Sequence, residues 1–337
     1  MIAGSHPLLA QGVRKRYRNT RALDGLDLEV ERGTVHALLG PNGAGKSTAV
    51  NVFTTLTHYD QGIVRVAGHD ARHEARQVRA AVGLVGQSTA LDEMLYGREN
   101  LVMFGRLHGL AKALATNRAA ELLDTFDLAS AADRKVATYS GGMRRRLDIA
   151  AGLVTTPSML FLDEPTTGLD PRGRNDVWKM IRQVVDEGTT VLLTTQYLNE
   201  ADELADRITV LGAGRVIAEG TAAELKDSLG GDRVIITART PDELAAIAAA
   251  VGGTADADSL QVTVKAAPAG RTPALVAAIR ALDDASIDVD DIALRRPSLD
   301  EVFLHLTGAS SSTVEDHSAG DVTDHLPDTH TAEGVSR

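Results

Sequence analysis

Short apolar runs alternate with helical patterns from residue 8 to about residue 229. Five of these runs have the length and composition of buried strands: 35–39, 82–85, 159–162, 191–194 and 208–211. Strands that alternate with helices predict an α/β domain around a mostly parallel sheet. Residues 91–154 carry apolar positions at helical spacing and no convincing strand, which predicts a helical insertion between the second and third strands.

The pattern restarts after Gly230 and Gly231. It predicts a strand at 234–238, a helix at 242–251, a strand pair within 254–264, a helix at 272–282 and a strand at 287–294. This β-α-β-β-α-β order is typical of a ferredoxin-like small domain, and it contains no catalytic constellation. We therefore expect a regulatory or dimer-stabilising module, with ligand sensing as the alternative. The predicted boundaries are 1–229, 230–308 and a tail at 309–337, which is rich in polar residues and expected to be disordered.

Composition narrows the functional classes. The chain has 337 residues, of which 43% are hydrophobic, and its longest strictly apolar run, Leu244–Val251, is far shorter than the roughly 20 residues of a membrane span. The N-terminus lacks the pattern of a signal peptide, so we expect a cytoplasmic location. The absence of cysteine excludes disulfides and thiolate metal sites, and the net charge of -11 argues against a nucleic-acid partner.

A glycine-rich segment follows the first strand and leads into a helical pattern. It matches G-x-x-x-x-G-K-[ST] and comprises Gly40, Pro41, Asn42, Gly43, Ala44, Gly45, Lys46, Ser47 and Thr48. In such a P-loop, backbone N–H groups surround phosphates, the lysine reaches the β- and γ-phosphates, and the serine hydroxyl binds Mg²⁺. A glycine-rich turn before a helix is the alternative. The complete match and its strand-to-helix context favour binding of ATP and Mg²⁺.

Two adjacent carboxylates, Asp163 and Glu164, end another apolar strand. Alone they could simply cap the strand end. Together with a P-loop they resemble a Walker B element, in which Asp163 holds Mg²⁺ and Glu164 acts as the base for the attacking water.

A short segment with two adjacent glycines, Tyr139-Ser140-Gly141-Gly142-Met143, precedes an arginine-rich helical pattern. Taken alone, Ser140 is most simply the N-cap of that helix. Its position about twenty residues before the Asp163 strand suggests a further role.

The order of these motifs resembles the ABC-type ATPase cassette over residues 8 to about 229. The fold implied is α/β, a P-loop ABC-type ATPase cassette with a helical insertion, plus the small ferredoxin-like α+β domain. The resemblance also implies that Ser140, Gly141 and Gly142 belong to the signature segment, which faces the γ-phosphate bound to the opposite subunit. Two chains are then needed for each complete site, so the cassette is expected to form a homodimer.

The same resemblance implies further roles at three positions. Tyr17 would stack on adenine, Gln87 would link Mg²⁺ and the attacking water to the membrane subunit, and Asp170 would belong to the loop that joins the two sites. Each has a structural alternative: a strand-edge aromatic, a polar strand end, and the N-cap of a helix with Pro171 at its first position.

The sequence departs from the usual cassette pattern at three positions. Tyr139 and Met143 replace the usual leucine and glutamine of the signature segment, and Gln196 stands where a histidine usually contacts the γ-phosphate. Glutamine can donate one hydrogen bond to that oxygen but cannot become cationic. We therefore expect hydrolysis that is slow.

These departures, with the late segment 297–307, resemble the daunorubicin-resistance subfamily of drug-export ATPases. That resemblance implies a cassette on the cytoplasmic face of the membrane that works with a separate multi-helix permease, through which an antibiotic, drug or lipid leaves the cell. The alternatives are an importer ATPase and a soluble ATP-driven switch with little turnover. A soluble ATPase acting on DNA or ribosomes is disfavoured, since the chain has one P-loop and no room for long coiled-coil arms.

Overall fold

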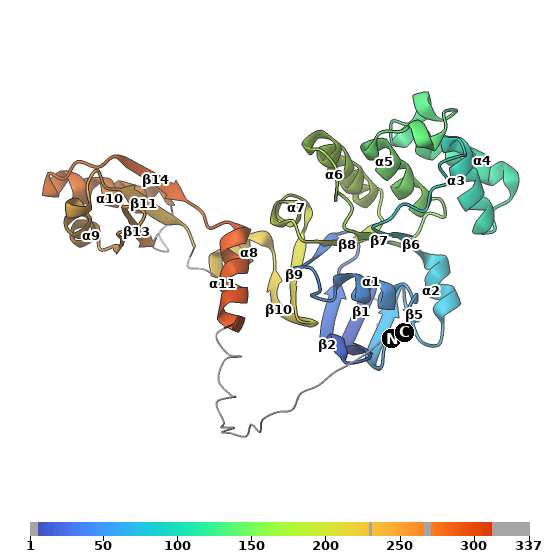
Figure 1. Ribbon diagram of the computed structural model, residues 1–337, viewed down its shortest axis with the longest axis horizontal. Helices are drawn as coiled ribbons and strands as arrows, with labels where there is room; N and C mark the ends of the chain where they lie inside the picture. Colours follow the sequence, from blue (N-terminus) through green and yellow to red (C-terminus); the bar gives the residue numbers. More distant parts are fainter. Residues whose placement is uncertain (1–5, 229–230, 266–270, 312–337) are drawn as a thin grey trace, which may run out of the picture.

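A six-stranded sheet forms the centre of the larger domain (Figure 1). The computed structural model describes residues 6–228, 231–265 and 271–311. The strand order is β10-β9-β3-β8-β7-β6, and β9, β3, β8, β7 and β6 run parallel while β10 is antiparallel. The strands are β3 (Val35–Leu39), β6 (Val82–Val85), β7 (Met159–Asp163), β8 (Thr190–Thr195), β9 (Arg207–Gly212) and β10 (Arg215–Gly220). All five buried strands expected from the sequence are thus confirmed.

A second sheet, fully antiparallel, has the order β2-β1-β4-β5. Its strands are β1 (Leu8–Tyr17), β2 (Thr20–Val30), β4 (Gln61–Val66) and β5 (His69–Asp70). Helix α1 (Lys46–Phe53) packs between this sheet and the central one, where the ring centroids of Phe53 and Phe161 are 6.4 Å apart. Helix α2 (Ala75–Ala81) leads into β6. The first helix is therefore held on both sides by buried apolar residues.

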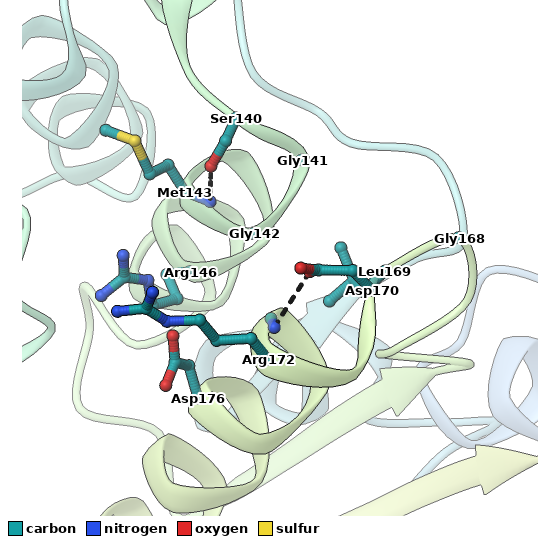
Figure 2. A pocket seen from close by; sticks show the side chains of 11 residues that line it. Ser140, Gly141, Gly142, Met143, Arg146, Gly168, Leu169, Asp170, Arg172 and Asp176 are labelled. Carbon is teal, nitrogen blue, oxygen red and sulfur yellow. Dashed lines mark hydrogen bonds between the residues drawn. The ribbon is translucent and has the colours of Figure 1, made fainter.

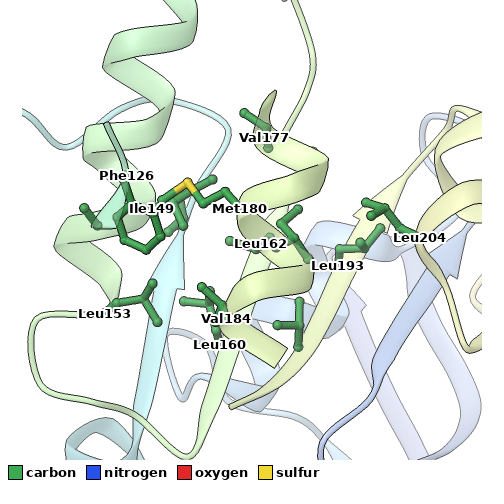
Figure 3. Packing of buried hydrophobic residues seen from close by; sticks show 14 of the residues in the cluster. Phe126, Ile149, Leu153, Leu160, Leu162, Val177, Met180, Val184, Leu193 and Leu204 are labelled. Atoms are coloured by element: carbon green, nitrogen blue, oxygen red, sulfur yellow. The ribbon is translucent and has the colours of Figure 1, made fainter. Parts of the chain in front are cut away.

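The insertion between β6 and β7 is helical, as predicted, with α3 (Gly97–Leu107), α4 (Lys112–Thr125) and α5 (Gly141–Gly152). Helix α6 (Pro171–Asp186) follows β7 and packs beside α5. Figure 3 shows the shared core, in which Ile149 of α5 and Met180 of α6 lie close to Phe126, above Leu160 and Leu162 of β7. Because one apolar core joins the insertion to the central sheet, the start of α5 has a defined position relative to β7.

The small domain has an antiparallel sheet in the order β12-β13-β11-β14. Its elements are β11 (Arg233–Thr237), α9 (Leu244–Val251), β12 (Thr254–Asp256), β13 (Gln261–Lys265), α10 (Arg271–Ala285) and β14 (Asp291–Arg295). This order is that of the ferredoxin-like fold. The last strand begins at Asp291 rather than at Ile287 as expected, since Ile287 and Val289 pack against the domain core before the strand pairing begins.

The chain then returns to the larger domain through α11 (Leu299–Ser311), which the sequence patterns did not predict. Leu299 and Val302 are buried in the same cluster as Leu204 of α7 (Leu198–Leu204) and Leu225 of α8 (Ala222–Ser228). Figure 1 shows α11 beside α8. The helix continues to Ser311, and the rest of the tail expected to be disordered lies outside the described residues. Among the described helices, none combines the length and apolar character needed to span a membrane.

Candidate functional site

The carboxyl ends of β3, β8, β7 and β6 meet at one edge of the central sheet, because these strands are parallel neighbours. Ligand sites of open α/β sheets lie at this edge. The segments that follow the four strands begin at Gly40, Gln196, Glu164 and Gly86. The topology thus brings four of the sequence-predicted motifs to the same place.

The glycine-rich loop is tightly enclosed by its neighbours. A Cβ atom at Gly40 would lie 2.5 Å from the carbonyl oxygen of Leu211, and one at Gly45 would lie 2.4 Å from that of Ala22. Gly45 also has φ +109°, a backbone conformation that residues other than glycine rarely adopt. The N–H of Gly40 donates to the carbonyl of Thr195 at 3.2 Å, which ties the loop to the end of β8.

Lys46 is the first residue of α1, and its side chain is only 4% exposed. Its Nζ donates to the carbonyl oxygens of Gly40 at 2.9 Å and Pro41 at 3.2 Å, and lies 3.4 Å from Oε1 of Glu164. The cation is therefore confined within the loop that the motif predicts to bind phosphates.

Two oxygen groups suited to a hard divalent cation lie side by side. The Ser47 hydroxyl donates to Oδ1 of Asp163 at 3.2 Å, and the Asp163 side chain is largely buried. Hydroxyl and carboxylate oxygens are ligands that Mg²⁺ accepts, with water and substrate phosphates completing its shell. These two residues fit Mg²⁺, while Gln87 lies two residues beyond the end of β6, the strand next to β7.

Glu164 has a strained backbone in a well-defined environment. Its φ is +48°, in the left-handed region that non-glycine residues rarely adopt. Its N–H points to Thr194, whose carbonyl and hydroxyl oxygens are each 3.1 Å away, and its Oε2 accepts from the Thr167 hydroxyl at 3.3 Å. Such strain persists where the surroundings impose it, and it concentrates at functional sites.

Thr194 links the Asp163 carboxylate to the backbone of Glu164. Its hydroxyl donates to Oδ1 of Asp163 and accepts from the N–H of Glu164. The next residues of this segment are also held, because the N–H of Tyr197 donates to the Thr195 hydroxyl at 2.9 Å. Gln196 lies between them, and the structure thereby brings its segment to the same edge as Glu164.

The signature-like segment lies in a different place. Ser140 caps α5, and its hydroxyl accepts from the N–H of Met143 at 3.2 Å. Gly141 and Gly142 line a pocket of about 510 Å³ with the loop 168–170 and the facing side chains of α5 and α6 (Figure 2). No residue of the glycine-rich loop 40–48 lines this pocket. Within one chain, the signature-like segment and the P-loop therefore belong to separate sites.

The loop after Glu164 ends at a second capped helix. Oδ1 of Asp170 accepts from the N–H of Gly173 at 3.0 Å, and Pro171 is the first residue of α6 (Figure 2). Ser140 and Asp170 are thus both helix N-caps, as the structural alternatives predicted. Neither excludes a further contact with a ligand, because each cap lies on the open pocket described above.

Tyr139 accounts for one departure from the usual signature pattern. Its ring is buried, burial raises the pKa of its phenol, and its hydroxyl donates to the carbonyl of Ala131 at 2.6 Å. A Cβ at Gly97 would lie 2.2 Å from the same hydroxyl oxygen. The larger aromatic residue therefore fits because a glycine faces it, and it anchors the segment to the helical insertion.

Tyr17 lies at the end of β1 and is 44% exposed, with the Lys15 ammonium 4.9 Å from its ring centroid. Strand β1 pairs with β2, whose Ala22 contacts Gly45 of the P-loop. The aromatic side chain is thus carried by the hairpin that borders the loop.

Sequence reasoning missed two residues of this region, Thr194 and Arg145. Arg145 is buried in α5 and donates to backbone carbonyls beside Glu164. Its spacing from Asp148, three residues later in the same helical pattern, was an available signal of a charged pair on one helix face.

Both domains of the chain resemble known proteins. The sequence profile of the ABC transporter family matches residues 23–167, and that of the C-terminal domain of DrrA1-3-like ATP-binding proteins matches residues 220–307. The chain is 57% identical to the daunorubicin resistance ATP-binding protein DrrA3 of Streptomyces coeruleorubidus, over 89% of this chain and 96% of that protein. It is 52% identical to the daunorubicin/doxorubicin resistance ATP-binding protein DrrA of Streptomyces peucetius, over 88% and 91% of the two chains.

Among solved structures, the chain resembles a dimeric ATP-binding cassette in a post-hydrolysis state bound to ADP and phosphate. The TM-score is 0.58 at 26% sequence identity, over 64% of this chain and 98% of that one.

Proposed function

This chain belongs to the daunorubicin-resistance ATP-binding proteins of the ABC transporter family, and from this premise we propose that it powers drug export through a separate membrane permease. It is an ATPase subunit, and its larger domain has the ATP-binding cassette fold. In the proposed cycle two copies close around ATP and reopen after hydrolysis.

The observation that carries the proposal is the convergence of Lys46, Asp163 and Glu164 at one edge of the sheet. In the proposed site the loop N–H groups and Lys46 bind the phosphates, and Glu164 accepts the proton of the attacking water. A Mg²⁺ held by Ser47 and Asp163 would neutralise phosphate charge. Catalysis is then mainly positioning and electrostatic stabilisation.

The separate location of the signature-like segment supports a dimer. Ser140 and its two glycines line a pocket with the loop 168–170, away from the P-loop of the same chain. The N–H groups at the start of α5 suit an anion. A second chain in the opposite orientation would bring the ATP at its own P-loop to this pocket, as the likeness to a dimeric cassette also suggests.

Exposed apolar side chains on the helical insertion support contact with a permease. Met94 is 68% exposed, Leu107 is 74% exposed and Leu114 is 55% exposed, so the insertion presents large apolar side chains to the outside. Met94 follows Gln87 by seven residues. We propose that this surface places the cassette against the membrane subunit, with Gln87 between the permease and the ATP site, so that the chain is peripheral to the membrane.

The proposed cargo follows from the relatives, which are named for resistance to daunorubicin and doxorubicin. We propose an antibiotic of that kind, bound by the permease rather than by this chain.

The test is ATP-dependent accumulation of daunorubicin in inverted lipid vesicles that contain the purified chain and its proposed permease. We expect the drug to raise the rate of Mg-ATP hydrolysis several-fold and to accumulate inside the vesicles. Vesicles with the permease and Glu164→Gln protein are the control. Hydrolysis without drug movement would contradict export, and absence of hydrolysis even with the permease would instead favour an ATP-driven switch.

Thr194→Val tests the link between the Asp163 carboxylate and the Glu164 backbone, because valine keeps the shape of threonine without its hydroxyl. We expect the free energy of unfolding to fall by about 1–3 kcal/mol, since a buried donor and acceptor lose their partner. We also expect kcat to fall about 10-fold or more through misplacement of Glu164. Urea unfolding and steady-state hydrolysis measure the two effects.

Thr209→Val is the matched control, because the buried Thr209 hydroxyl lies 2.8 Å from Nε2 of His36 on neighbouring strands of the same sheet. It should destabilise the fold comparably and leave kcat unchanged. Equal kcat values in the two folded variants would rule out a role of Thr194 in positioning.

A further inference from the structure

Arg145 lies in the second turn of α5, the helix that begins after Ser140, and its side chain is 8% exposed. Its guanidinium donates to three backbone carbonyls. Nη1 reaches the oxygen of Gly86 at 2.8 Å, Nε reaches that of Pro165 at 2.7 Å, and Nη2 reaches that of Asp163 at 3.2 Å. One side chain of α5 thus holds the segments that follow both β6 and β7.

Asp148 extends this contact on the same helix. Its Oδ2 lies 3.3 Å from Nη1 of Arg145, and its Oδ1 accepts from the N–H of Ala90 at 3.3 Å. Gly86 and Ala90 stand on either side of Gln87. The Arg145–Asp148 pair therefore holds the backbone before and after this glutamine.

The same arginine also brackets Glu164. The two carbonyls it binds, those of Asp163 and Pro165, belong to the residues immediately before and after Glu164. Glu164 adopts φ +48°, so neighbouring groups must impose its conformation. Two charge-assisted hydrogen bonds from a buried cation are suited to do so.

We propose that Arg145 is a positioning residue for ATP hydrolysis: it holds Glu164 and Gln87 in a fixed relation to the signature-like segment at the start of its own helix. Movement of α5 when two chains close is then transmitted to the backbone that carries the proposed base. This inference rests on the proposed function and assigns no contact between Arg145 and ATP.

Arginine is suited to this position because its five N–H groups lie in one plane and diverge toward several acceptors. Burial lowers the pKa of the Arg145 guanidinium, and the Asp148 carboxylate beside it opposes the shift. Lysine would keep the charge but present its donors from a single nitrogen. Arg145→Lys should therefore keep part of the network, and Arg145→Ala should lose it.

The experiment compares wild type, Arg145→Lys, Arg145→Ala and Asp148→Asn by three measurements: melting temperature, Kd for Mg-ATP, and kcat. Because a small misplacement of a catalytic group costs up to about 100-fold, we expect kcat to fall roughly 10- to 100-fold in Arg145→Lys and further in Arg145→Ala. The Kd should stay within about twofold, since the P-loop is unchanged. Asp148→Asn should lower kcat by a smaller factor.

The control is Arg182→Ala, which removes a partly exposed arginine of α6 that also binds a carbonyl, that of Glu203 at 3.1 Å, and pairs with Asp206. It should leave kcat unchanged. A folded Arg145→Lys protein with wild-type kcat, or one whose Kd weakens as much as its kcat falls, would overturn the inference. If Arg145→Lys does not fold, a folded Asp148→Asn protein with wild-type kcat would overturn the inference. A wild-type protein that does not hydrolyse ATP even with the permease contradicts the proposed function instead.

Discussion

Replacing Glu164 by glutamine is expected to stop ATP hydrolysis and to preserve ATP binding. Glutamine has nearly the shape of glutamate, so the contacts with Thr194 and Thr167 can remain, but its amide cannot accept the proton of an attacking water. Loss of a general base lowers the rate by about 100- to 10,000-fold. The Kd for Mg-ATP should change little, because binding depends on the P-loop.

Two measurements separate this prediction from a general loss of activity. Steady-state hydrolysis gives the rate, and size-exclusion chromatography with Mg-ATP tests whether the variant accumulates as the dimer that slow hydrolysis should trap. Glu187→Gln is the control, since Glu187 is the C-cap residue at the far end of α6 and its carboxylate accepts from Gln183 at 3.2 Å. A Glu164→Gln protein that retains more than about a tenth of the wild-type rate would show that another group accepts the proton.

Much of this fold was predictable because its signals are local. The five buried strands have apolar runs of the right length, and the P-loop has a spacing that few other structures require. The parallel order of these strands then dictates that Gly40, Glu164 and Gln196 share one edge. Sequence order and simple topology were sufficient to place the principal groups together.

Other features depend on distant contacts and carry weaker signals. Helix α11 is stabilised by burial of Leu299 and Val302 against α7 and α8, which are about 75 to 100 residues earlier in the chain. The hydroxyl of Thr194 resembles any strand threonine until Asp163 is placed beside it. These roles come from tertiary packing, and a residue pattern does not reveal them.

The role of Gln196 illustrates the remaining gap. Its neighbours Thr195 and Tyr197 are held by hydrogen bonds, so the side chain begins from a defined backbone position at the edge that carries Glu164. A neutral amide can still donate to a phosphate oxygen. We therefore expect slow hydrolysis by the wild-type protein. The steady-state measurements that compare it with Glu164→Gln give this rate directly.

Replacing Lys46 by alanine is expected to have the opposite signature, namely loss of ATP binding itself. The buried ammonium sits at the start of α1 within the P-loop, and a hydrogen bond between charged groups contributes about 1.5–3 kcal/mol. We therefore expect Kd for Mg-ATP to rise by about 10- to 150-fold. Equilibrium binding of a fluorescent ATP analogue measures the change, with the surface variant Lys179→Ala as control.

The ion pair with Glu164 makes the Lys46 prediction sharper. Nζ of Lys46 lies 3.4 Å from Oε1 of Glu164, and both side chains are at least 90% buried. Lys46→Ala alone leaves a buried carboxylate without its cation, which costs folding free energy. Adding Glu164→Gln removes that charge, so the double variant should regain stability in urea unfolding while ATP binding remains weak. If ATP binding recovered together with stability, the weak binding of Lys46→Ala would be a consequence of its weakened fold. Lys46 would then support the fold and would not bind phosphate.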